Sequence, residues 1–126
     1  MTDLFAPEGG WRVRIRDNSG GAEEGPDGTN VVEEIEGFLT LMQANEFARR
    51  YVRDSLERCR APGLSAHEVV DAWHAFGEDA EIIDAGDLGW KSATELEAFA
   101  ETPAYAEDRD WRSLDPRQDD EPEDEE

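Results

Sequence analysis

The sequence predicts an α+β fold: a small antiparallel sheet of about three strands, with helices packed on one of its faces. Two observations carry this prediction. The stretch from Trp11 to Arg16 alternates strictly between large apolar and charged residues, which is the period of a half-buried strand. Over residues 41–60, apolar side chains recur at three- and four-residue steps, which is the period of an amphipathic helix. The expected order of elements is β-β-α-α-β-α.

Length and composition predict a single domain followed by an acidic tail. The 126 residues suffice for one hydrophobic core and are too few for two. We expect the folded domain to span residues 1–114, with a loose lead-in over residues 1–10 and a mobile, glycine-rich loop over residues 17–30. Residues 115–126 contain eight acids, one arginine and no large apolar side chain, so this tail is expected to be disordered.

The first two strands are expected to pair as an antiparallel hairpin. In the first, Trp11, Val13 and Ile15 face the core, and the arginines between them face outward. The second strand covers residues 31–38, where the apolar spacing departs from a period of two, so a bulge is expected. A short third strand covers residues 80–83. The apolar members assigned to the second strand are Val32, Ile35 and Phe38.

Three helices are predicted, each opening with a capping box, in which a Ser or Thr and a Glu or Gln three residues later satisfy free backbone amides. The first ends near Arg60, before Pro62; the second ends at Gly77 and the third at Pro103. The capping pairs are Thr40 with Gln43, Ser65 with Glu68, and Ser92 with Glu95. In the second and third helices, the residues expected to face the core are Val69, Val70, Trp73, Phe76, Leu96, Phe99 and Ala100. Residues 104–114 are expected to be irregular and to be held against the domain by Tyr105, Trp111 and Leu114.

Charge is the most unusual global feature. The chain carries 33 acids against 12 basic residues, a net charge of −21. Such a surface repels phosphates and anionic membranes and attracts basic proteins, so direct nucleic-acid binding and membrane binding are not expected. The sequence has no signal-like N-terminus, no long apolar run and a single cysteine, Cys59, which together predict a soluble protein of the cytoplasm.

Arg12, Arg14 and Arg16 form a basic row on this acidic chain, and two interpretations are open. The row could bind an anion or an acidic peptide. Alternatively, it could pair with Glu34 and Glu36 across the hairpin, because opposite charges on neighbouring strands attract each other. We favour the pairing.

Trp90 and Trp111 flank turns, and of the four tryptophans these two are the least clearly assigned to the core. An exposed tryptophan is a typical anchor for a protein partner. The alternative is that each ring folds back as a lid on the core.

His67, Asp71 and His74 are spaced i, i+4, i+7 and share one helix face, so they are candidate ligands for zinc or a similar ion. The alternative is a solvated polar face. Cys59 lies on the apolar stripe of the first helix and is interpreted as a core residue rather than a nucleophile. No catalytic set is recognisable, and no cofactor is predicted.

These observations favour a non-catalytic protein-interaction module, such as an adaptor, an inhibitor or a chaperone-like protein, that binds a basic partner. Its candidate contacts are the arginine row, the two tryptophans and the tail acids. One alternative is a nucleic-acid mimic that occupies a DNA-binding protein. Another is a small metal-dependent enzyme that uses His67, Asp71 and His74. The sequence leaves the oligomeric state open.

Overall fold

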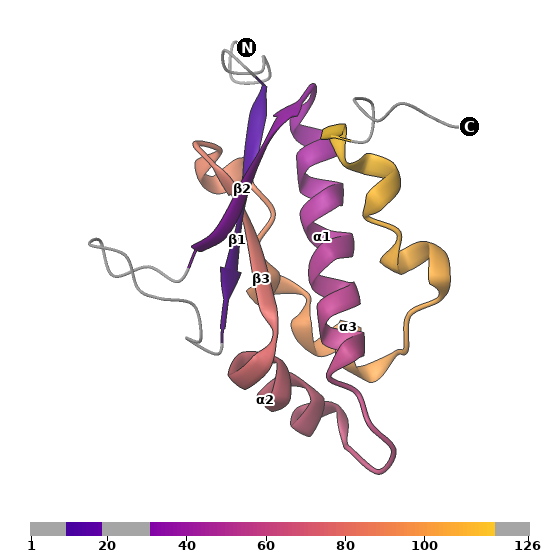
Figure 1. The fold of residues 1–126 in the computed structure, drawn as a ribbon. Coiled ribbons are helices and arrows are strands. Elements are labelled where there is room, and N and C mark those ends of the chain that lie inside the picture. The colour runs from indigo at the N-terminus through magenta and orange to yellow at the C-terminus, as the bar shows by residue number, and fades with distance from the viewer. Residues whose placement is uncertain (1–9, 19–30, 118–126) are drawn as a thin grey trace.

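The computed structural model describes residues 10–18 and 31–117 and confirms the α+β class and the predicted order of elements. The expected lead-in and the glycine-rich loop lie almost wholly outside the described residues. In Figure 1 the long helix runs along one side of a twisted sheet. The strands are β1 (Trp11–Asp17), β2 (Val31–Phe38) and β3 (Glu78–Ile83), and the helices are α1 (Leu41–Arg58), α2 (Ala66–Phe76) and α3 (Leu96–Glu101). Short 3-10 turns occupy Gly86–Leu88, Ser92–Thr94, Ala106–Arg109 and Arg112–Leu114.

The sheet has the order β2-β1-β3, and both pairings are antiparallel. The predicted hairpin of β1 with β2 is therefore confirmed, and β3 lies on the other side of β1. The expected irregularity falls between Ile35 and Phe38, so both side chains face the core. A second register shift falls at Val32, between the pairs Ile15–Glu33 and Arg16–Val31, and the Val32 side chain is 46% exposed. The sequence leaves the register of this strand open, so it does not predict the face on which Val32 lies.

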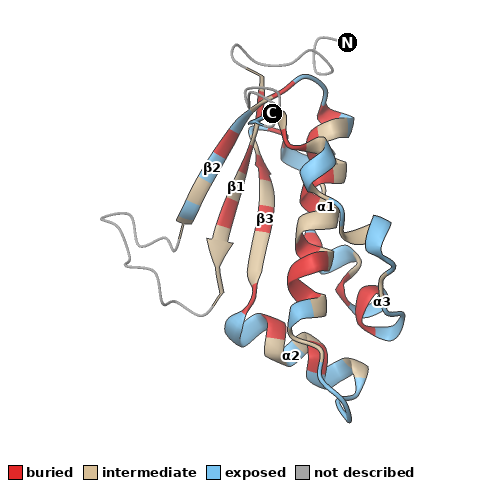
Figure 2. Cartoon of the chain, turned by 45° about the vertical axis from the view of Figure 1, so that its right-hand side comes forward, coloured by how far each residue is buried: buried red, intermediate tan, exposed pale blue. Residues whose placement is uncertain are grey.

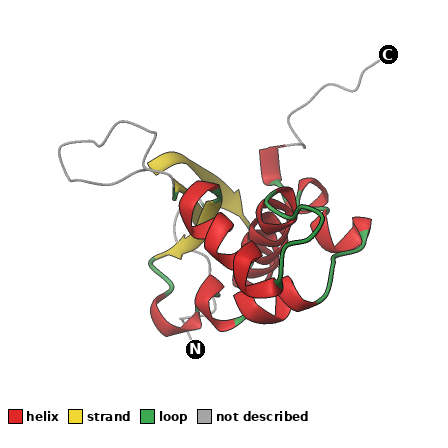
Figure 3. Ribbon diagram, turned by 90° about the horizontal axis from the view of Figure 1, so that it is seen from below, coloured by secondary structure: helices red, strands yellow, loops and turns green. Residues whose placement is uncertain are grey.

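Helix α1 covers the inner face of the sheet. Figure 2 shows buried residues alternating with intermediate ones along β1 and recurring along α1. Seen from below, along the axis of α1, the strands lie to one side of the helix and the C-terminal turns lie to the other (Figure 3). The side chains that fill the space between sheet and helix include Val13, Ile15, Ile35, Phe38, Phe47, Ala48, Val52, Leu56 and Ile82.

The three predicted caps have three different outcomes. Ser65 and Glu68 form the complete capping box. Thr40 accepts a hydrogen bond from the backbone amide of Gln43, but the Gln43 side chain accepts from the amide of Leu39 instead of closing the box. The third box does not form. A 3-10 turn starts at Ser92, and α3 begins only at Leu96.

Helix α2 ends at its C-cap, Gly77, as predicted. The Trp73 ring fills the space that a side chain at residue 77 would need, so glycine is required at this position. Val69 and Trp73 are buried, but Phe76 is 75% exposed, so its assignment to the core was wrong. The Trp73 indole folds back under the end of the helix and donates to the carbonyl of Glu78 at 3.2 Å. It thereby occupies the position next to the sheet and leaves Phe76 outside.

The C-terminal segment lies against α1. Trp111 and Leu114 pack on the core as expected, whereas Tyr105 is 74% exposed and does not pin the chain. Asp115 is only 8% exposed, and Arg117 pairs with Asp115 and with Glu33 of β2. The folded body therefore extends past the predicted boundary after residue 114, and the rest of the predicted tail, residues 118–126, lies outside the described residues. Among the described helices, none has the length and apolar composition needed to cross a membrane.

Candidate functional site

The basic row on β1 is paired within the sheet. Arg14 lies between two carboxylates, with Nε 3.1 Å from Glu34 and NH1 3.6 Å from Glu81. Arg16 also reaches Glu81, with NH2 at 2.8 Å. The central position of β1 explains this arrangement, since it places an acidic strand on each side of the arginines. Arg12 completes the row, 3.0 Å from Asp84, while Glu36 forms no ion pair with the described residues.

Both candidate tryptophans hold polar contacts inside the chain. Trp90 donates from Nε1 to Glu95 at 2.8 Å, and its ring stacks on Phe99. Trp111 donates from Nε1 to Asp54 at 3.2 Å. Both rings are half-buried against the core. These contacts match the lid interpretation, and a role of either residue in binding a partner stays a prediction.

Asp54 is a buried hub that the sequence patterns did not reveal. Asp54 is only 7% exposed. Its carboxylate accepts hydrogen bonds from Arg58, Arg109 and Trp111. The bond from Arg109 Nε is 2.8 Å long. Asp54 thereby ties the C-terminal segment to α1. Because Arg109 and Trp111 lie 55 and 57 residues further along the chain, a local sequence pattern cannot predict this hydrogen-bond network.

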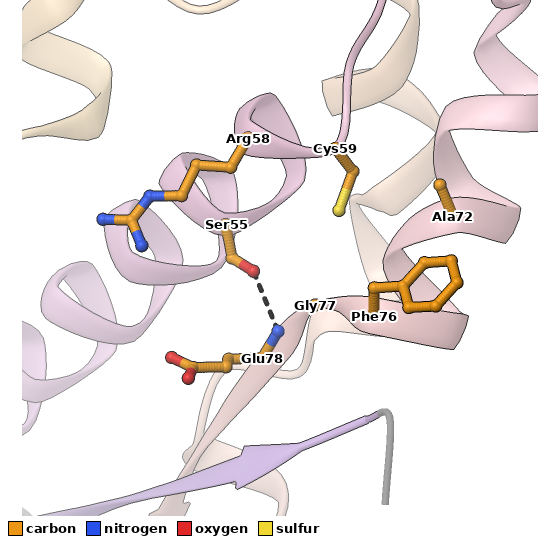
Figure 4. A pocket seen from close by; sticks show the side chains of 7 residues that line it. All are labelled: Ser55, Arg58, Cys59, Ala72, Phe76, Gly77 and Glu78. Carbon is orange, nitrogen blue, oxygen red and sulfur yellow. Dashed lines mark hydrogen bonds between the residues drawn. The ribbon is translucent and has the colours of Figure 1, made fainter. Parts of the chain in front are cut away.

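A pocket of about 340 Å³ lies between the ends of α1 and α2 (Figure 4). Figure 4 shows the Cys59 thiol and the exposed Phe76 ring on its walls, with the Ser55 hydroxyl accepting a hydrogen bond from the amide of Glu78 at 2.8 Å. Burial raises the pKa of the Cys59 thiol, so the thiol form predominates at neutral pH. The Arg58 side chain, also drawn there, is bound to Asp54. No histidine lies among the lining residues to activate the thiol.

Cys59 was expected on the core stripe and is half-buried instead, because it sits at the C-cap of α1 rather than within the helix. Nearby, Tyr51 donates to Glu78 at 2.5 Å. Burial and that hydrogen bond raise the pKa of the Tyr51 hydroxyl above its usual range. The Cys59 thiol and the Tyr51 hydroxyl therefore stay protonated near neutrality.

The predicted metal face brings two of its three residues together. His67 Nε2 lies 3.4 Å from Asp71 Oδ2, and the His74 ring packs edge-on against Trp73. Over residues 10–18 and 31–117, no group of three or more His, Cys, Asp or Glu side chains is arranged to hold a metal ion. The i, i+4, i+7 spacing correctly placed these residues on one exposed face of α2, but that face does not form a ligand set.

The same face of α2 forms one wall of a groove, and α3 forms the other. The groove has a volume of about 410 Å³. Its floor consists of small apolar side chains, Ala66 and Val70 from α2 and Ala100 from α3. Two further carboxylates, Glu97 and Glu101 of α3, stand on its rim beside Asp71 and the histidines. From the sequence only the α2 wall was identifiable, because the packing of α3 against α2 is a tertiary contact.

The cations of the chain are engaged internally. Most arginines of the described residues form ion pairs with carboxylates of the chain. Arg53 and Arg112 lie over the rings of Phe99 and Trp111, and Lys91 donates to the carbonyl of Gly86. The exposed carboxylates that form no hydrogen bond or ion pair with another described residue are Glu36, Asp87, Glu97, Glu101 and Glu107.

In comparisons with protein-family models, with curated proteins and with solved structures, no match to this chain was found. Its function must therefore be inferred from the chemistry of the surface itself.

Proposed function

We propose that this protein is a non-catalytic interaction module that binds a basic protein partner. The observation that carries the proposal is the uneven use of charge. The arginines are engaged by carboxylates or aromatic rings of the chain, whereas five exposed carboxylates have no cationic partner among the described residues. The whole sequence carries a net charge of −21. Complementary charge speeds the encounter with a basic protein and selects against acidic ones.

Neither the Cys59 thiol nor the Asp54 carboxylate is proposed to act as a catalytic group. The Cys59 thiol has a raised pKa, and the Asp54 carboxylate is surrounded by donors that fix it in place. We place this role in the reducing cytoplasm as part of the proposal, since Cys59 is a free thiol. A nucleic-acid mimic has less support, because many of the described carboxylates are paired with arginines instead of forming rows of free charge.

The test is capture on the immobilised full chain from a lysate of the source cells, at about 0.1 M and about 0.5 M salt, where screening differs strongly. We expect one or a few basic proteins to be retained at low salt and released at high salt. Each captured protein is then purified and titrated against the chain, and binding must weaken as salt rises. Capture of acidic proteins only, or binding that is insensitive to salt, would contradict the proposal.

A further inference from the structure

The groove between α2 and α3 has a fixed apolar floor. Val70 and Ala66 pack against the core on one side, and Ala100 is buried on the other. A floor of this kind accepts the methylene groups of a long side chain without any rearrangement of the groove. The volume of about 410 Å³ falls within the range of small binding pockets, so one long side chain fits inside it.

The rim of the groove carries negative charge that no cation of the described residues neutralises. Glu97 and Glu101 lie one turn apart on α3 and repel each other. Neither meets a cation among the described residues. On the opposite wall, Asp71 Oδ2 lies 3.4 Å from His67 Nε2, and Asp71 forms no ion pair with an arginine or lysine of the described residues.

The arginines nearest to α3 are committed elsewhere. Arg49 pairs with Glu95 at 2.9 Å, and Arg53 lies over the Phe99 ring. Arg60 pairs with Glu57 and donates to the carbonyl of Ala100 at 3.0 Å. Glu97 and Glu101 are therefore exposed, and neither side chain forms a hydrogen bond or an ion pair with another described residue.

We propose that this groove binds one arginine side chain of the basic partner, with its methylene groups on Val70 and Ala100 and its guanidinium between Asp71 and the glutamates of α3. A guanidinium offers planar paired donors that match carboxylates on two sides. A phosphate or an anionic lipid is excluded by the same charges. The assignment rests on the proposed function and names the surface and the anchor through which it would operate.

The experiment is an NMR titration of the ¹⁵N-labelled full chain with a blocked tripeptide that has a central arginine. The comparison peptide carries citrulline, which keeps the shape and removes the charge. We expect saturable shifts at the amides of the groove residues with the arginine peptide, and binding at least about tenfold weaker with citrulline. Equal shifts with both peptides, or shifts spread evenly over the acidic surface, would overturn the assignment.

Two variants of equal net charge sharpen the test. Glu97→Gln/Glu101→Gln removes two rim charges, while Glu36→Gln/Asp87→Asn removes two unpartnered charges elsewhere. The first variant should bind the arginine peptide about tenfold more weakly than wild type, and the second should change the affinity for this peptide less than about twofold. The peptide comparison on the unmodified chain stands even if a variant folds poorly. If the groove variant still captures the basic partner at full strength, the proposed function stands and the groove assignment fails.

Discussion

Arg49 and Glu95 are joined by two parallel hydrogen bonds, each 2.9 Å long, that connect the middle of α1 to the residue preceding α3. Glu95 also accepts the indole N–H of Trp90 at 2.8 Å. These three donors explain why Glu95 does not serve as a capping residue for Ser92. They also fix α3, and with it one wall of the groove, relative to α1.

The change Glu95→Gln should destabilise the protein by about 1–2 kcal/mol, because it removes a bidentate charge-assisted pair that is partly exposed. The pKa of Glu95 is lowered by the hydrogen bonds from Arg49, against the opposing effect of burial. Its stabilising effect is therefore complete above the unfolded pKa of about 4.3 and is lost as the pH falls through the folded value. Urea unfolding at pH 7 and below pH 4 measures the difference, which should shrink in acid. Glu97→Gln is the matched control, and an equal loss in both variants would refute the role of the clamp.

The change Asp54→Asn should lower the free energy of unfolding by about 2–3 kcal/mol, more than Glu95→Gln does. The reason is that the new amide group would point its own N–H donors at the donors of Arg58 or Trp111 in a buried site. Denaturant unfolding gives the free energy, and the indole N–H resonance of Trp111 reports whether the C-terminal segment has come loose. Glu107→Gln, an exposed position in the same segment, should leave both unchanged. A loss smaller than about 0.5 kcal/mol would mean that the network adds little.

The change Asp79→Asn should increase the stability of the protein at pH 7, in contrast to the two changes above. Burial raises the pKa of the Asp79 carboxyl, although hydrogen bonds from Ser92 and from the amide of Ala80 oppose this shift. A raised folded pKa means that the favourable contribution exists below the unfolded pKa of about 3.9 and is lost as the pH rises through the folded value. At pH 7 the wild-type charge is a cost, which the amide removes. The variant should be more stable at pH 7 and lose that advantage toward pH 4, with Asp87→Asn as the exposed control. Lower stability at pH 7 would contradict this account.

Truncation at two positions locates the end of the folded body. Removing residues 115–126 should lower stability by about 1 kcal/mol relative to removing residues 118–126, because only the longer deletion discards Asp115 and Arg117. Pro116 is also lost, and its ring lies where a side chain at Gly37 of β2 would contact it. Thermal unfolding of the two shortened chains measures the difference directly. Identical melting temperatures would show that residues 115–117 contribute nothing.

Local patterns predicted the elements better than the contacts between them. The alternation along β1 and the pair Ser65/Glu68 depend on neighbours in sequence, and both are confirmed. The pattern Ser92/Glu95 looks equally local, but a distant arginine, Arg49, competes for the glutamate and wins. Sequence-local rules cannot include such a competitor, because it lies 46 residues away.

The candidate site shows the same division. The spacing of His67, Asp71 and His74 identified an exposed polar face of α2, yet the meaning of that face depends on what packs beside it. Glu97 and Glu101 supply the second wall, and only the docking of α3 brings them there. The misplaced Phe76 and Tyr105 have a related cause: an apolar residue near the end of an element need not find a surface to cover.

The most direct test of the central claim is the affinity of the captured basic partner for three forms of the full chain at one salt concentration: wild type, Glu97→Gln/Glu101→Gln, and Glu36→Gln/Asp87→Asn. The account predicts that the groove variant binds about tenfold more weakly, while the equally charged control stays within about twofold of wild type. If both variants bind the partner equally weakly, the loss of affinity is due to overall charge and not to the groove. Unchanged affinity in both would contradict the claim that the groove is the contact site for the partner.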